Sequence, residues 1–321
     1  MPGSFLTDEF DRLILEASNR TARSFNLYSW LLVETKMFEI IFEDADLLVM
    51  NKPANLVCHP TKNGEDSSLI GRVRMYLNIS PPNSVCPHPN PLPSDGRGGV
   101  LRAHMVNRLD RETSGVVIIA KSASVAGELG KIWETRAVQK EYRALVHGHL
   151  NEEHGIINAA LGKDENSSIA IKDCVRADGV PARTEYWIEH RFWMSVSELR
   201  QADQEKYSNT CAPPALPFSL LKVQPRTGRK HQIRIHLAYH GHPIVGDKLY
   251  GGDEDLYLAL VQDRLTQEQR IRLVLPNHAL HASEIRFHWR SVERAYKANS
   301  PDWLLKASRG QGRTGPRLCH P

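Results

Sequence analysis

The order of strand-like and helix-like segments constrains the fold of this chain more than any other feature of its sequence. Short apolar segments with strand character recur between residues 38 and 289, and the helical segments among them follow no regular alternation. The strand candidates are FEIIF (38–42), DLLVM (46–50), VVIIA (116–120), YRALVHG (142–148), TEYWIEH (184–190), SVSEL (195–199), FSLLKV (218–223) and SEIRFHW (283–289). This order favours an α+β domain built around a mixed, mostly antiparallel sheet, flanked by helices and loops.

Helical patterns are predicted at three places within this series. The first spans residues 68–77, the second runs from Ser122 to about Thr135, and the third runs from Gly228 to Tyr239. Gly241 and Pro243 are expected to stop the third helix. In the last strand candidate, Ile285, Phe287 and Trp289 alternate with polar residues, which predicts that they share one face of the sheet.

The sequence suggests three regions along the chain. Residues 1–37 form a mostly helical N-terminal segment, residues 38–296 form the main domain, and residues 297–321 form a disordered tail. The segment 79–99 contains six prolines and three glycines, a composition that supports neither a helix nor a central strand. We expect it to be a mobile surface insertion.

Composition excludes several classes of protein. The five cysteines are scattered without CxxC spacing, so neither a disulfide framework nor a zinc site is expected. His231, His236 and His240 are closely spaced, but the sequence contains no HExxH motif or comparable set of metal ligands. No apolar segment approaches the ~20 residues needed to span a bilayer. A soluble, cytoplasmic, metal-free and monomeric protein is therefore expected.

One charged segment, VNRLDRETSG (106–115), places Asp110 between Arg108 and Arg111. It could simply be a charged turn that caps the following strand. An unperturbed aspartate has a pKa of roughly 3.9, and neighbouring arginines lower it further. Such a carboxylate stays ionised at neutral pH, which suits nucleophilic chemistry better than acid catalysis.

Two further segments carry residues suited to nucleic acid. Tyr142 begins the strand candidate 142–148, where it is either a half-buried strand tyrosine or a ring that stacks on an unpaired base. In PRTGRKHQIRIHLAYHGHPIVGDKLYG (225–251), Arg226, Lys230 and Arg234 recur at i, i+4 spacing. If the helix begins at Gly228, they lie along one face, which is either a solvated face or a phosphate-facing one.

Together these segments resemble one family, the RluA-type pseudouridine synthases. NRLDRETSG, KEYRALVHG and TGRKHQIRIHLAYHGHPIVGD are similar, in order, to the three signature stretches of that family. NKPANLVCHP (51–60) and HALHASEIRFHW (278–289) are similar to its flanking boxes, and GVPARTEYWIEH (179–190) to an intervening strand. The resemblance covers roughly residues 38–290. It implies the fold of a pseudouridine synthase catalytic domain and the isomerisation of a uridine in ribosomal or transfer RNA.

The resemblance also implies a role for individual residues. Asp110 matches the catalytic aspartate, Tyr142 the aromatic residue that packs against the target base, and Arg234 the arginine that pairs with the catalytic carboxylate. Arg108 matches the arginine that fills the gap left by the flipped nucleotide. The family uses neither a cofactor nor a metal. Further contacts to the RNA backbone are expected from Arg111, Arg226, Arg229 and Lys230.

The chain departs from the family pattern at two positions. Asn107 stands where the family usually has histidine, and asparagine cannot titrate. Asn55 stands where the family commonly has glycine, and asparagine tolerates left-handed backbone geometry better than most residues. Two other functions are open for these residues: a non-catalytic RNA-binding protein on the same fold, and a glycoside hydrolase, which normally needs two carboxylates acting together.

Overall fold

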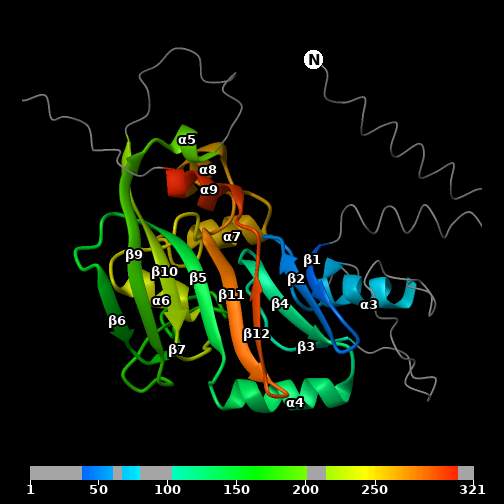
Figure 1. The fold of residues 1–321 in the computed structure, drawn as a ribbon. Helices are drawn as coiled ribbons and strands as arrows, with labels where there is room; N and C mark the ends of the chain where they lie inside the picture. Colours follow the sequence, from blue (N-terminus) through cyan, green and yellow to red (C-terminus); the bar gives the residue numbers. More distant parts are fainter. Residues whose placement is uncertain (1–37, 61–66, 80–102, 201–214, 310–321) are drawn as a thin grey trace, which may run out of the picture.

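The computed structural model describes residues 38–60, 67–79, 103–200 and 215–309 (Figure 1). The expected N-terminal helical segment (1–37) lies outside these residues. So does the expected insertion at 79–99, except for Ile79, which ends a helix. No helix in the described part of the chain is both long enough and apolar enough to cross a membrane.

A ten-stranded sheet carries the fold. Its main path is β1 (Glu39–Glu43), β2 (Leu47–Lys52), β4 (Ser114–Ala120), β11 (Leu280–Trp289), β5 (Gln139–His147), β10 (Leu216–Pro225), β9 (Arg183–Met194) and β6 (His154–Asn158). Outside this path, β3 (His104–Met105) pairs with β4, and β12 (Val292–Lys297) pairs with β11. Neighbouring strands are antiparallel except β4 and β11, which are parallel. The predicted α+β fold with a mostly antiparallel sheet is confirmed.

Burial along the strands follows their position in the sheet. All seven residues of β4 are buried, as expected for a central strand covered on both faces. In β11, Ile285, Phe287 and Trp289 are buried whereas Arg286 and His288 are exposed, so the predicted alternation is confirmed. A separate two-stranded sheet consists of β7 (Leu161–Lys163) and β8 (Asp173–Val175).

Helices cover both ends and parts of both faces of the main sheet. They are α3 (Leu69–Ile79), α4 (Ala123–Glu134), α5 (Val196–Arg200), α6 (Gln232–Tyr239), α7 (Asp255–Val261), α8 (Gln267–Leu273) and α9 (Asp302–Arg309). In Figure 1, α4 crosses one end of the sheet at the bottom of the view, and α5, α8 and α9 gather at the other end. The predicted bounds of α4 are confirmed to within one residue, with Ser122 and Thr135 as its caps.

The segment SVSEL (195–199) was predicted as a strand, and this is wrong. Val196 begins the short helix α5. Ser195 and Glu198 form a reciprocal pair: the Glu198 amide donates to Ser195 Oγ (3.3 Å), and the Ser195 amide donates to Glu198 Oε2 (2.9 Å). This arrangement is a capping box, and its Ser-x-x-Glu pattern was present in the sequence.

The predicted start of the third helix at Gly228 is also wrong. Helix α6 begins at Gln232, after His231 in the left-handed conformation (φ 54°). The side chain of Gln232 folds the preceding turn, because its Oε1 accepts bonds from Thr227 Oγ1 (2.6 Å) and the Arg229 amide (3.1 Å). Arg226 and Lys230 therefore precede the helix and share no helical face with Arg234.

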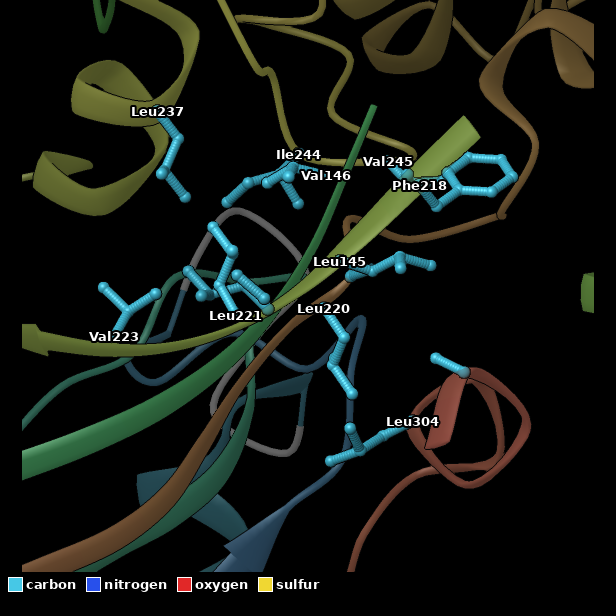
Figure 2. Close-up of a cluster of buried hydrophobic side chains, with 14 of the residues drawn as sticks. Leu145, Val146, Phe218, Leu220, Leu221, Val223, Leu237, Ile244, Val245 and Leu304 are labelled. Atoms are coloured by element: carbon cyan, nitrogen blue, oxygen red, sulfur yellow. The ribbon is translucent and has the colours of Figure 1, made fainter. Parts of the chain in front are cut away.

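The tail predicted from residue 297 onward is ordered as far as Arg309, which corrects that expectation; residues 310–321 lie outside the described part. Helix α9 buries Leu304 and Ala307 in the largest hydrophobic cluster of the molecule. Figure 2 shows Leu304 of α9 and Leu237 of α6 approaching the β5–β10 region from opposite sides. Burial of this apolar face, which composition alone did not reveal, explains why the segment folds.

Candidate active site

The loop that carries Asp110 joins β3 to β4 and is held by buried contacts from the segment after β2. The buried Lys52 ammonium donates to the carbonyls of Pro53 (2.8 Å), Leu56 (2.8 Å) and Arg111 (3.1 Å). The thiol of Cys58 donates to the Leu109 carbonyl at 3.3 Å. The NKPANLVCHP segment is thus more than a connecting loop, because it fixes the residues on either side of Asp110.

Three charged side chains meet beneath that loop. Arg234 Nη1 donates to Asp110 Oδ2 at 3.0 Å. The other edge of the same guanidinium binds Asp247 through Nε (2.7 Å) and Nη2 (2.9 Å). Asp247 is fully buried, Arg234 nearly so, and the Asp110 side chain is 29% exposed. A planar arginine fork suits this arrangement, because one edge is held bidentately while the remaining nitrogen points at the second carboxylate.

The environment keeps Asp110 ionised. Burial by itself would raise the pKa of this carboxyl group, but the attraction and hydrogen bond of Arg234 outweigh it and hold the pKa below its ordinary value. His231 Nε2 lies 3.9 Å from Asp110 Oδ1, and burial lowers the pKa of His231 to about 4. At neutral pH, His231 is therefore uncharged and Arg234 supplies the positive charge beside Asp110.

Asp110 opens onto a cleft of about 660 Å³ that Tyr142 and Arg234 also line. Tyr142 lies on β5 and packs against two hydrophobic clusters, one on each side of it in the sheet. Burial, with a smaller contribution from Asp110, raises the pKa of the Tyr142 hydroxyl, so the ring stays neutral. A charged carboxylate and an aromatic face thus share one cavity that is large enough for a nucleotide-sized ligand.

A model of the family described as RNA pseudouridylate synthase matches residues 46–239, more than half of the chain. The chain belongs to this family. The match confirms the resemblance to RluA-type pseudouridine synthases drawn from the signature segments.

Several relatives in the family carry names that describe their activity. An uncharacterized RNA pseudouridine synthase of Aquifex aeolicus is 35% identical over 66% of this chain and 55% of its own length. Ribosomal large subunit pseudouridine synthase D of Zymomonas mobilis is 30% identical over 78% of this chain and 64% of its own. Ribosomal large subunit pseudouridine synthase C of Pasteurella multocida is 31% identical over 82% of this chain and 64% of its own length. The chain thus spans between 55% and 64% of the length of these relatives.

Solved structures support the same fold at lower identity. Human RNA Pseudouridylate Synthase Domain Containing 4 superposes with a TM-score of 0.57 at 20% identity, covering 88% of this chain and 97% of the human one. Human RNA Pseudouridylate Synthase Domain Containing 1 superposes with a TM-score of 0.56 at 22% identity, covering 88% of this chain and 98% of the human one. The fold of the chain is that of a pseudouridylate synthase domain.

The residues predicted to contact RNA divide into two groups. Arg108, Arg229 and Lys230 line the same cleft as Asp110, and Arg108 is exposed there. Arg229 donates to the Pro181 carbonyl (3.3 Å), and Lys230 forms an ion pair with Asp173 (2.8 Å). Arg111 and Arg226 do not line that cleft. Arg111 donates to Asn55 Oδ1 (2.9 Å), and Arg226 pairs with Glu185 (2.6 Å).

The two departures from the family pattern both have structural roles. Asn107 is buried, donates to the Val116 carbonyl (3.1 Å) and accepts from the Ile118 amide (2.9 Å), so it ties the loop to β4. Both ends of its amide are used in this way. Asn55 has a φ of 65°, the left-handed geometry expected where the family commonly has glycine.

Sequence reasoning missed the residues that support the three central ones. Asp247 was overlooked although it lies in the quoted GHPIVGD stretch, and its neighbour Lys248 pairs with Glu112 (2.9 Å). The buried His278, in the quoted HALHASE stretch, contacts Thr113 Oγ1 at 2.7 Å. For Asp247 the available signal was a charged residue beside a glycine and apolar residues in the GHPIVGD turn. Only its burial shows that it supports Arg234.

The closely spaced histidines are occupied by protein partners. His236 contacts Thr184 Oγ1 (2.8 Å) and the Ala159 carbonyl (2.9 Å), His240 contacts the Tyr186 hydroxyl (3.1 Å), and His231 contacts the Tyr250 hydroxyl (2.9 Å). Within the described ranges, no group of three or more His, Cys, Asp or Glu side chains could hold a metal ion.

Proposed function

We propose that this protein is an RNA pseudouridine synthase that isomerises a specific uridine in ribosomal or transfer RNA, with Asp110 as its catalytic group. The observation that carries the proposal is the Asp110 carboxylate, kept ionised by Arg234 in a cleft that also contains the Tyr142 ring. The names of the Zymomonas and Pasteurella relatives, which specify the large ribosomal subunit, favour ribosomal RNA. The free thiols of Cys58 and Cys174 support a reducing compartment such as the cytoplasm.

The reaction breaks the N1–C1′ bond of uridine, turns the uracil and joins C5 to C1′. The hydrogen at C5 leaves as a proton, and N1 gains one, so the product is an isomer of the substrate. The target uridine must first leave the base stack, at a cost of a few kcal/mol. Asp110 either attacks C1′ or removes the proton at C2′ to give a glycal-like intermediate, and both routes need an ionised carboxylate.

Each neighbouring residue has a role in this scheme. Arg234 holds the Asp110 carboxylate charged and oriented, through the nitrogen that Asp247 leaves free. Tyr142 packs against the uracil and keeps the released base in the cleft. Arg108, exposed at the cleft, fills the gap left by the flipped nucleotide. Arg229 and Lys230 contact the RNA backbone from the same cleft, while Arg111 and Arg226 contribute from outside it.

The test is the release of tritium from ribosomal and transfer RNA transcripts labelled at uridine C5. Asp110→Asn is expected to lower release by at least about 10³-fold, because the substitution keeps the shape of the side chain but removes its charge. Asp178→Asn, at an exposed carboxylate paired with Arg176, is the matched control and should release tritium like wild type. Folded wild-type protein that binds these RNAs without releasing tritium would overturn the proposal in favour of a non-catalytic RNA-binding protein.

A further inference from the structure

A second cavity of about 300 Å³ adjoins the cleft that contains Asp110. It lies between the end of α4, the start of β5 and the loop from β10 to α6. The two cavities share a wall made by Trp133, Lys140, Pro225, Thr227, Gly228 and Arg229. A ligand in the main cleft can therefore extend into the second cavity without leaving the protein surface.

Most of the cations that line the second cavity have no carboxylate partner among the described residues. Four basic residues line it, namely Arg136, Lys140, Arg226 and Arg229, against one carboxylate, Glu134. Arg226 is paired with Glu185. Among the described residues, no carboxylate pairs with the other three. This unbalanced positive charge favours an anionic ligand.

Lys140 lies at the passage between the two cavities. It is two residues before Tyr142 on β5, so both side chains project from the same face of the strand. A Cβ atom built on Gly228 would lie 3.8 Å from Lys140 Nζ, which places the ammonium beside the shared wall. Burial lowers the pKa of Lys140. A half-buried ammonium without a partner costs free energy, and an anion bound beside it would recover that cost.

We propose that the second cavity binds the nucleotide next to the target uridine in the RNA strand, and that Lys140 and Arg229 bind the phosphate that joins the two. The inference rests on the proposed function and adds a substrate requirement to it. That requirement is a second nucleotide, joined to the uridine by a charged phosphate. Arg136, at the far side of this cavity, is available to the following phosphate.

The test is a thermodynamic cycle between Lys140 and the phosphates that flank the uridine. The probe is a labelled, single-stranded seven-nucleotide RNA with one central uridine, either all-phosphate or with uncharged methylphosphonates on both sides of that uridine. Affinity is measured by fluorescence anisotropy on proteins carrying Asp110→Asn, so that no turnover occurs. Lys140→Gln is compared with Lys140→Arg, which keeps the charge, and with Lys297→Gln, at an exposed lysine of β12 that lines neither cavity.

The proposal predicts that Lys140→Gln weakens binding of the all-phosphate RNA several-fold and lowers the salt-dependence slope by about 0.7, the value for one phosphate contact to a single strand. Methylphosphonates should weaken binding to the protein that keeps Lys140, but they should lower the affinity of Lys140→Gln little further. The proposal is overturned if methylphosphonates weaken binding equally with Lys140 and with Lys140→Gln. It is also overturned if Lys140→Gln binds like Lys297→Gln, or if the RNA does not bind at all.

Tritium release from transcripts separates the two proposals. Release by wild type without coupling between Lys140 and the phosphates overturns the second-cavity proposal alone. Coupling without release overturns the proposed activity and leaves a nucleotide-binding cavity in place.

Discussion

At the scale of single residues, the central feature is one arginine shared by two carboxylates of different exposure. The sequence, through the family resemblance, presents Arg234 only as the partner of Asp110. The structure adds Asp247, which is fully buried and receives two of the three guanidinium bonds. Since a buried carboxylate without its partner is strongly unfavourable, Arg234 must also stabilise the fold.

Arg234→Ala is therefore expected to lower the free energy of unfolding by about 3–5 kcal/mol, because Asp247 would remain buried without its counterion. Urea denaturation measures this loss. Arg290→Ala is the matched control, since Arg290 is half exposed where it pairs with Glu128 and Asp46. Solvent screens such an exposed pair, so its loss should change stability much less than the loss of Arg234. Equal losses in the two variants would contradict a structural role for the Asp247 pair.

At the scale of elements, the Asp110 loop is anchored where β4 meets β11. The two strands are parallel there and pair through only two residue pairs, one of which is Gly115 with Ala282. Gly115 has a φ of 116°, and a Cβ on it would lie 2.2 Å from the Ala282 carbonyl oxygen. Glycine is required at this position because the two backbones approach too closely for any side chain.

Two glycine substitutions are expected to change stability in opposite directions. Gly115→Ala should destabilise the protein by about 2–4 kcal/mol, through backbone strain and the clash with β11. Gly127→Ala should stabilise it by about 0.5–1 kcal/mol, because Gly127 lies inside α4 with nothing within 4 Å of the added methyl group. Thermal and urea denaturation measure both. A neutral Gly115→Ala would show that β4 and β11 can separate freely.

At the scale of the whole molecule, three histidines that are buried or nearly so link folding to pH. Burial lowers the pKa of His278 to about 3 and of His231 and His281 to about 4, from an ordinary value of 6.5. Below pH 6.5 these histidines bind protons in the unfolded chain, whereas in the folded protein their lowered pKa keeps them neutral. Their contribution to stability is complete above that pH and is lost as the pH falls toward 4.

Lowering the pH from about 7 to about 5 is expected to reduce the free energy of unfolding by about 1–2 kcal/mol for each of these histidines. Urea denaturation across this range measures the slope. On β11, His281→Gln should flatten the slope by about one histidine. Stability that does not vary with pH in this range would show that these rings take up protons in the folded protein as readily as in the unfolded chain.

Much of the fold could be predicted because its signals are local. The alternation in SEIRFHW predicts which face of β11 is buried, and the caps of α4 predict where that helix begins and ends. The order of the segments, without a βαβ rhythm, predicts the fold class. Where a local pattern was misread, as in SVSEL and at the start of α6, the cause was a side-chain bond to nearby backbone. Ordering of α9 depended on burial against distant strands, which no local pattern reports.

For the site, the sequence gives the available residue types, and the family resemblance predicts that Asp110, Tyr142 and Arg234 belong together. How these side chains meet depends on the folded chain. Asp110 and Arg234 are 124 residues apart in the chain, and their contact depends on the path of every strand between them. The same path buries Asp247 behind Arg234 and brings Lys140 beside Gly228. Burial and unpaired charge arise from long-range packing, so they can be assigned only after the chain has folded.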